Sequence, residues 1–300
     1  MTPIIETHSI TKIYHKIKVI DDVSIEILPG QVVGLVGSNG AGKTTLFRIL
    51  SGLIIPNSGD VAYSGEKKGK AFDLAKTKIG VTIDAPSLYP RLSARDNIKA
   101  YALGRNLKIN DSAISEALHT VGLEDNQKVV RNFSMGMKQR LSIAMALFGG
   151  CEIIMLDEPF NGLDPIGLKQ ISDQIRAINR EKNITFVIAS HNLAELEELC
   201  DRFVFLENGK IIKRLSKSEL EKKEQRIISF LSSEENRVAD FFKQNSISYR
   251  KEGGRFFVFY DDDPLNLIDS MKQNSLSMHD LSISKENLMD IYSKGRVYDE

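Results

Sequence analysis

A glycine-rich segment between an apolar run and a helix-forming run has the residue types that bind a phosphate group. The run before it, residues 32–36, is short and apolar, as a buried parallel strand should be. Residues 45–50, after it, have apolar side chains at helical spacing. Strand, glycine loop and helix together are the context in which this pattern predicts a phosphate site. The segment reads Gly37, Ser38, Asn39, Gly40, Ala41, Gly42, Lys43, Thr44.

Each residue type in this loop has a chemical use. The glycines allow successive backbone N–H groups to point inward and surround a β-phosphate. Lys43 adds a positive charge for the β- and γ-phosphate oxygens, and Thr44 offers a hydroxyl group to Mg2+. The sequence therefore predicts a nucleotide site.

Two adjacent carboxylates, Asp157 and Glu158, end a second apolar run at residues 153–156. Ligands of open α/β sheets gather at the carboxyl ends of the strands, so we expect both acids to face the phosphate loop. Asp157 would hold the Mg2+ shell, and Glu158 would orient or deprotonate the water that attacks the γ-phosphate. The alternative is that the two acids merely end a strand in a solvated turn.

Ser134 stands where the N-cap of a helix belongs, in the segment 133–140 that leads into the strongly helix-forming stretch at residues 141–148. A helix N-terminus attracts anions, so this segment is a candidate for a second phosphate-binding device in the same chain. The alternative interpretation is an ordinary helix cap.

Taken in order, these segments resemble the ATP-binding cassette (ABC) ATPases, over roughly residues 4–220. Residues 37–45 resemble the Walker A loop, which adds Thr45 to the nucleotide contacts. Residues 153–158 resemble the Walker B strand with its catalytic glutamate, and residues 134–140 resemble the family signature. Each later segment alone is weakly specific, whereas the complete ordered set is strongly specific.

Further positions receive a role through this resemblance. Residues 161–164 resemble the D-loop, with Asp164 expected at the nucleotide, and Tyr14 falls where the family places an aromatic ring against adenine. His191 resembles the switch histidine, and it follows the apolar strand expected at residues 184–190, from which it would reach the γ-phosphate. A lone histidine in a loop is otherwise a simple polar residue.

The chain departs from the family pattern at two places. Met135 and Met137 replace a glycine and the usual glutamine of the signature, while Ser134 and Gly136 are retained. Asp84 occupies the position of a family glutamine, and its side chain is shorter and negatively charged. An aspartate there can approach Mg2+ or its waters. An acidic residue at this position resembles the pattern found in exporters of bacitracin and lantibiotic-like peptides.

The resemblance also implies an assembly. In the family, the signature of one cassette completes the phosphate site of another, so that two cassettes enclose two ATP molecules head to tail. We therefore expect Ser134 and Gly136 to contact the γ-phosphate held at Lys43 of a facing subunit. Hydrolysis then removes the differential affinity that holds the pair closed.

Composition limits the class of protein. The 40 basic and 40 acidic side chains cancel, which argues against a nucleic-acid partner. A hydrophobic fraction of 42% is sufficient for a sizeable core, and no stretch approaches the ~18 apolar residues of a membrane-spanning helix. Cys151 and Cys200 lack metal-ligand spacing. Any membrane crossing would therefore belong to separate permease subunits, with this chain on the cytoplasmic face of the bacterial cell membrane.

The sequence predicts two domains. The resemblance implies an α/β P-loop cassette over residues 1–222, with a mixed sheet core, an antiparallel β subdomain and a helical subdomain at about residues 85–150. Residues 85–92, bounded by prolines, are interpreted as part of a groove for a permease helix, or else as an internal loop. Residues 223–300 predict a small α+β domain in the order β-α-β-β-α-β, possibly ferredoxin-like. Its second and last strands are expected at residues 246–250 and 276–283, with a last helix at residues 285–293. Residues 261–263, three aspartates, are interpreted as a solvated turn.

The leading functional hypothesis is the ATPase subunit of a bacterial transporter that exports an amphipathic peptide or a hydrophobic drug. A soluble cassette protein acting on ribosomes or nucleic acid is the alternative, although such relatives usually carry two cassettes or a long coiled-coil insertion. A small-molecule kinase is a third class, for which the Ser134 segment and Glu158 have no evident use.

Overall fold

The computed structural model describes residues 2–83, 88–222, 226–260, 263–285, 288, 290 and 291. Asp84, residues 85–87 of the proposed docking loop and residues 261–262 of the aspartate turn lie outside the described residues, as does much of the helix expected at 285–293. The chain forms two compact units, Met1–Ser216 and Lys217–Glu300, and each is described by itself.

The first unit is organised by a six-stranded sheet in the order β5-β6-β7-β3-β8-β9. Neighbouring strands run parallel, except that β9 pairs antiparallel with β8. Every residue of the three central strands β6, β7 and β3 is buried, as expected for parallel strands covered on both faces. The strands are β3 Val32–Val36, β5 Ile79–Thr82, β6 Ile153–Asp157, β7 Thr185–Ser190, β8 Arg202–Glu207 and β9 Lys210–Ser216.

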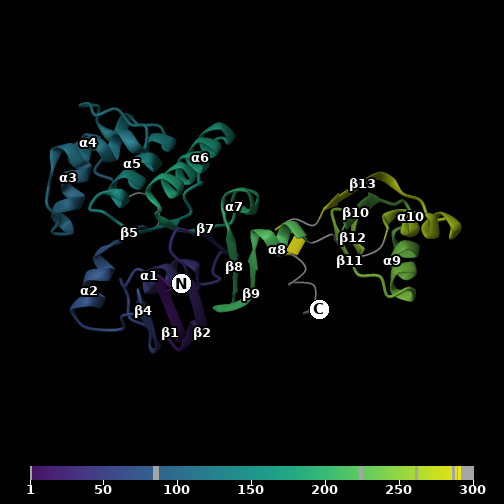
Figure 1. The fold of residues 1–300 in the computed structure, drawn as a ribbon. Helices are drawn as coiled ribbons and strands as arrows, with labels where there is room; N and C mark the ends of the chain where they lie inside the picture. The colour runs from purple at the N-terminus through teal and green to yellow at the C-terminus, as the bar shows by residue number, and fades with distance from the viewer. Residues whose placement is uncertain are drawn as a thin grey trace. The chain divides into compact units, whose positions relative to one another are not determined.

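A second, antiparallel sheet of the same unit has the order β2-β1-β4. Its strands are β1 Ile5–Tyr14, β2 Ile17–Ile27 and β4 Ser58–Tyr63. Buried side chains of this sheet share one hydrophobic cluster with the central sheet and with helix α1, Lys43–Leu50. In Figure 1, α1 and the antiparallel sheet lie on one side of strands β5 and β7, and helices α3 to α6 lie on the other.

The helical subdomain lies between β5 and β6 in the chain, within the range expected from the sequence. Arg95 connects separate segments of this subdomain, because its guanidinium donates hydrogen bonds to Asp125, Asp111 and Ser115. The hydrogen bond from Arg95 holds the pKa of the Asp125 carboxyl group below its usual range. The helices are α3 Ala94–Gly104, α4 Asp111–Thr120, the 3-10 turn η1 Val130–Asn132 and α5 Met135–Leu147. Elsewhere in the unit lie α2 Lys70–Thr77, α6 Pro165–Lys182 and α7 Leu193–Leu199.

The second unit begins with α8, Lys217–Lys222, and then has the chain order β-α-β-β-α-β that the sequence predicts. Its four strands pair antiparallel in the order β11-β12-β10-β13, which is the ferredoxin-like arrangement. Helices and sheet enclose a core rich in phenylalanine. The elements are β10 Arg226–Leu231, α9 Glu235–Gln244, β11 Tyr249–Glu252, β12 Arg255–Tyr260, α10 Pro264–Gln273 and β13 His279–Lys285.

Two of these strands begin later than the sequence predicts. Strands were expected at 246–250 and 276–283, whereas β11 and β13 begin at Tyr249 and His279. Ser246 and Ser275, with φ values of 54° and 53°, turn the chain in a left-handed conformation after each helix. The first residues expected in each strand therefore lie in or directly after this turn, and each strand begins after them. Among the described residues, no helix is both long and apolar enough to cross a membrane.

Gly80 in β5 sets how closely the helical subdomain packs on the sheet. A Cβ atom added there would lie 2.3 Å from the backbone oxygen of Ala146 in α5. We expect Gly80→Ala to lower the free energy of unfolding by about 1–3 kcal/mol or more, because the helix must shift. At Gly104 an added Cβ meets nothing within 4 Å, so Gly104→Ala should leave stability unchanged or raise it by up to about 1 kcal/mol. Urea unfolding of both variants measures the difference, and equal stabilities would contradict this account.

Candidate functional site

The loop between β3 and α1 is shaped by contacts that only glycine permits. Gly42 has φ 103°, and an added Cβ would lie 2.7 Å from the backbone oxygen of Val19. A Cβ at Gly37 would lie 2.6 Å from the backbone oxygen of Leu206. Because Gly42 has no side chain to cap α1, a bound anion can accept hydrogen bonds from the first N–H groups of this helix.

The ammonium group of Lys43 is held inside this loop. The residue is only 6% exposed. Its Nζ donates to the backbone oxygens of Gly37 at 2.8 Å and Ser38 at 3.2 Å, and lies 3.8 Å from Glu158 Oε1. A buried charge needs such partners, and this arrangement keeps a positive charge at the loop where an anionic ligand would enter.

Thr44 and Asp157 meet at the carboxyl ends of two strands that are not neighbours. Thr44 Oγ1 donates a hydrogen bond to Asp157 Oδ2 at 2.7 Å, although β7 lies between β3 and β6. Hydroxyl and carboxylate oxygens are the ligands that Mg2+ prefers, so this donor set fits that cation. In the part of the chain that the structure describes, no cluster of three or more His, Cys, Asp or Glu could hold a metal.

Glu158 is held in an unusual conformation beside this pair. Its φ of 50° is a left-handed value that costs a non-glycine residue about 1–3 kcal/mol. The strained turn is fixed by a hydrogen bond from Glu158 N to Ala189 O at 2.8 Å. Glu158 Oε2 contacts His191 Nδ1 at 2.8 Å and accepts hydrogen bonds from Ser190 Oγ and the His191 backbone N–H, both at 3.3 Å. One carboxylate oxygen thus faces the end of β7, and the other faces Lys43.

A cavity of about 450 Å³ opens over these groups. This volume lies in the range of small-molecule sites. Of the expected site residues, those that line it come from the loop and from the end of β6: Ser38, Asn39, Gly40, Gly42, Lys43, Thr44, Thr45, Asp157 and Glu158. The structure therefore brings together the phosphate loop and the two acids, as the sequence predicts.

Other expected site residues do not line this cavity. Gly37 and Ala41 are buried within the loop backbone. Tyr14 is 40% exposed at the end of β1, and its ring centroid lies 5.3 Å from Lys12 Nζ. His191 does not line the cavity, but its Nδ1 atom contacts Glu158 Oε2. Asp84 lies outside the described residues. The roles of these residues stay predictions.

Three further expected residues lie at helix starts: Ser134 and Gly136, expected to serve a facing subunit, and Asp164, expected at the nucleotide. Ser134 is exposed and caps α5, with Oγ accepting from the Met137 N–H at 3.2 Å. A Cβ added to Gly136 would touch only Leu163 and Ser134 Oγ, both at about 4 Å, so the backbone there is approachable. Asp164 caps α6 by accepting from the Gly167 N–H at 2.9 Å. Both the cap and the anion-binding interpretation of Ser134 are compatible with this geometry.

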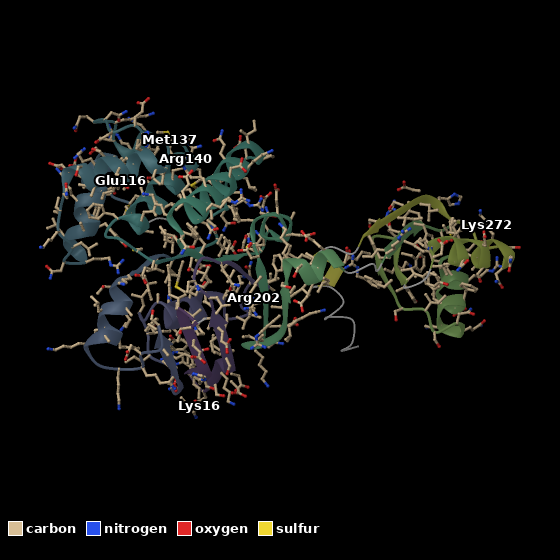
Figure 2. All side chains as sticks on the ribbon, viewed as in Figure 1. Lys16, Glu116, Met137, Arg140, Arg202 and Lys272 are labelled. Carbon is tan, nitrogen blue, oxygen red and sulfur yellow. The ribbon has the colours of Figure 1, made fainter. Side chains whose placement is uncertain are left out.

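Four cavity residues were missed by the sequence reasoning: Val19, Met135, Gln139 and Asn161. Met135 and Gln139 lie one turn apart on α5, so their spacing could have indicated a common helix face. Met135 also packs toward Gly162, where an added Cβ would lie 3.3 Å from Met135 Cε. Figure 2 labels Met137 and Arg140 on the same helix, where Arg140 donates to Gln170 of α6.

Comparison with known proteins gives a consistent result. Residues 20–161 match the family model described as ABC transporter. The chain is 40% identical over 248 residues to the bacitracin transport ATP-binding protein BcrA of Bacillus licheniformis, covering 82% of this chain and 80% of that protein. It is 31% identical over 298 residues to BcrA of Enterococcus faecalis, covering 98% of this chain and 96% of the relative.

The fold is also that of a solved relative. The dimeric structure of MJ0796, a bacterial ABC transporter cassette, superposes with a TM-score of 0.63 at 25% sequence identity. The match covers 71% of this chain and 98% of that cassette. The α/β P-loop cassette fold expected from the sequence is thereby confirmed.

The position of Lys43 predicts a specific loss of nucleotide affinity. Charge-assisted hydrogen bonds contribute about 1.5–3 kcal/mol each, so Lys43→Ala should weaken binding roughly 10- to 100-fold. Titration with a fluorescent ATP analogue measures this change. Lys78→Ala is the matched control, because Lys78 forms only an exposed ion pair with Glu152 and should bind as the unmodified chain does. Equal losses in both variants would contradict the assignment.

Proposed function

The chain belongs to the ABC transporter family, and on that premise we propose that its ATPase powers export of an amphipathic peptide of the bacitracin class. It is the ATP-binding and ATP-hydrolysing subunit of a transporter. The observation that supports the hydrolytic role most directly is the placement of Glu158 between Lys43 and His191, over the cavity that the phosphate loop lines. The family match and the transport relatives favour water over a small-molecule hydroxyl group as the attacking nucleophile.

In the proposed reaction, Glu158 accepts a proton from the water that attacks the γ-phosphorus, while the bond to the leaving β-phosphate oxygen breaks. His191 holds Glu158 through its Nδ1 contact at 2.8 Å, and Ser190 supports the same oxygen. Lys43 keeps its positive charge beside the phosphates from a buried position. His191 and the hydrogen bonds at the turn thus orient the base and preserve its strained conformation.

Thr44 and Asp157 would hold Mg2+, and Asp84 would approach it or its waters. Bound there, the ion would neutralise charge on the β- and γ-phosphate oxygens. The hydrogen bond between Thr44 Oγ1 and Asp157 Oδ2 places the two oxygens close enough to share one cation. Tyr14 would contact the adenine ring from the end of β1.

We further propose that two copies, or this chain and a second cassette, close over ATP head to tail. Ser134 and Gly136, at the exposed start of α5, would contact the γ-phosphate of the facing subunit, with Asp164 nearby. The dimeric cassette structure to which the chain is similar supports this arrangement. Permease subunits would then supply the membrane path, with the cassettes at the cytoplasmic face.

Glu158→Gln should separate binding from turnover. The amide keeps the size of the side chain but is a far weaker base, so we expect ATP hydrolysis to fall about 100-fold or more. Binding should persist, and the variant should accumulate as an ATP-dependent dimer in size-exclusion chromatography. Glu152→Gln, in an exposed ion pair just before β6, is the control and should hydrolyse ATP normally. Normal turnover in Glu158→Gln would reject the assigned base.

The proposed cargo is tested in the bacterium that makes the protein. Deleting the coding sequence should raise sensitivity to bacitracin several-fold, and the unmodified chain should restore resistance whereas Glu158→Gln should not. Affinity purification from crosslinked membranes should recover a membrane-spanning subunit with the chain. Unchanged bacitracin sensitivity together with a recovered permease would overturn the cargo and keep the transporter. Recovery of ribosomes instead would favour the soluble alternative.

A further inference from the structure

In the part of the second unit that the structure describes, strand β13 lies at one edge of the sheet, and no strand pairs with its outer side. It is the last strand in the order β11-β12-β10-β13, and among the described residues its only sheet partner is β10. Residues 279–284 are all exposed. They include Leu281 and Ile283, at 41% and 45% exposed, on the face that also carries the buried Ile228 of β10. An edge with unpaired backbone groups and exposed apolar side chains is a template for pairing with another strand.

The opposite edge of the same sheet is protected. Strand β11 is short and carries Arg250, Lys251 and Glu252. Lys251 forms an ion pair with Glu235 at 2.6 Å. Short length and charged side chains are the means by which proteins prevent edge pairing. The two edges therefore differ: β11 carries three consecutive charged residues, whereas the second half of β13 carries Leu281 and Ile283 alternating with serines.

We propose that β13 pairs antiparallel with β13 of a second copy of this chain, joining two four-stranded sheets into one continuous sheet. This contact goes beyond ATP hydrolysis and does not require nucleotide. Through this pairing, the C-terminal domains would hold two cassettes together between catalytic cycles.

The sequence of β13 is self-complementary in one register. Under a two-fold axis through Ser282, each Leu281 lies opposite Ile283 of the other copy, and the two Ser282 residues lie opposite each other. Moving the axis by one residue in either direction places His279 opposite Ile283 or Lys285 opposite Leu281, and moving it by two places a polar or charged residue opposite both. Opposed residues on antiparallel strands point to the same face, so this register groups all four apolar side chains.

A local irregularity limits the contact to the second half of the strand. The pairing of β13 with β10 shifts register between Ser229 and Leu231, and Asp280 has φ 49°. Arg255 forms an ion pair with Asp280. The straight segment from Leu281 onward keeps its register with β10, through Ser229 opposite Ser282 and Ile228 opposite Ile283. The self-complementary pairs lie within that segment.

A second copy is the occupant that fits best, because transport cassettes of this family work in pairs. When two cassettes are also held in one transporter, the effective concentration of the two C-terminal domains rises toward the millimolar range, which strengthens the contact further. An isologous contact also closes on itself, so it yields pairs instead of fibres.

A cysteine scan of the full chain tests the register. Opposed residues on antiparallel strands have Cα atoms about 4.5–5.5 Å apart, a separation that a disulfide can span, so Ser282→Cys should form a disulfide between two copies under mild oxidation without ATP. Lys251→Cys, on the charged edge, is the matched control and should stay monomeric on a non-reducing gel. The native Cys151 and Cys200 are buried, and burial raises the pKa of Cys151 to about 11, so neither should react at neutral pH. Equal crosslinking of both variants, or none in Ser282→Cys, would overturn the proposal.

A charge placed on the edge tests the same contact in solution. Leu281→Lys should weaken nucleotide-free self-association at least tenfold in analytical ultracentrifugation. Leu265→Lys should not, because Leu265 is similarly exposed, at 59%, but lies on α10. ATP-dependent dimerisation of Glu158→Gln is measured in parallel. Loss of that dimer with retained Ser282→Cys crosslinking would reject the cassette mechanism alone, and the reverse result would reject the edge pairing alone.

Discussion

The buried ammonium group of Lys43 is the constraint on which the site depends. A charge at 6% exposure is stable only with close partners, and it finds them in two loop carbonyl groups and in Glu158 at 3.8 Å. The glycine loop must curl to bring its carbonyl groups inward, and β6 must end where its second acid can reach the same point. The loop conformation, the strand order and the position of the base are therefore coupled.

This coupling places the reacting groups before any ligand arrives. Thr44 already meets Asp157 at 2.7 Å, and Glu158 is fixed by Ala189, Ser190 and His191 in a backbone conformation that few residues adopt. Strain of about 1–3 kcal/mol at a single residue persists only where surrounding contacts determine its position. In this family of ATP-driven transporters, the proposed consequence is a base held ready for water once a triphosphate occupies the loop.

Prediction from the sequence was strongest where short-range pattern and chemistry agree. The loop at 37–44 and the acids at 157–158 were found because each lies directly after an apolar strand. The ferredoxin-like order of the second unit also followed from the alternation of elements. Prediction did not assign Val19, Met135, Gln139 and Asn161 to the cavity, although the last three lie in segments that resemble family motifs. Which side chains of those segments reach the cavity depends on how they approach the phosphate loop in the folded chain.

The sequence by itself determined the phosphate loop and the two acids, because backbone freedom at glycine, strand burial and residue chemistry are local properties. Its ordered motifs determined the cassette fold through their resemblance to the ABC ATPases. Only the tertiary structure decided that Thr44 reaches Asp157 across an intervening strand, that Glu158 adopts φ 50°, and that Met135 and Gln139 face the loop. It also decided which edge of the second sheet is left open. These features follow from strand order and packing between distant segments, which spacing along the chain does not specify.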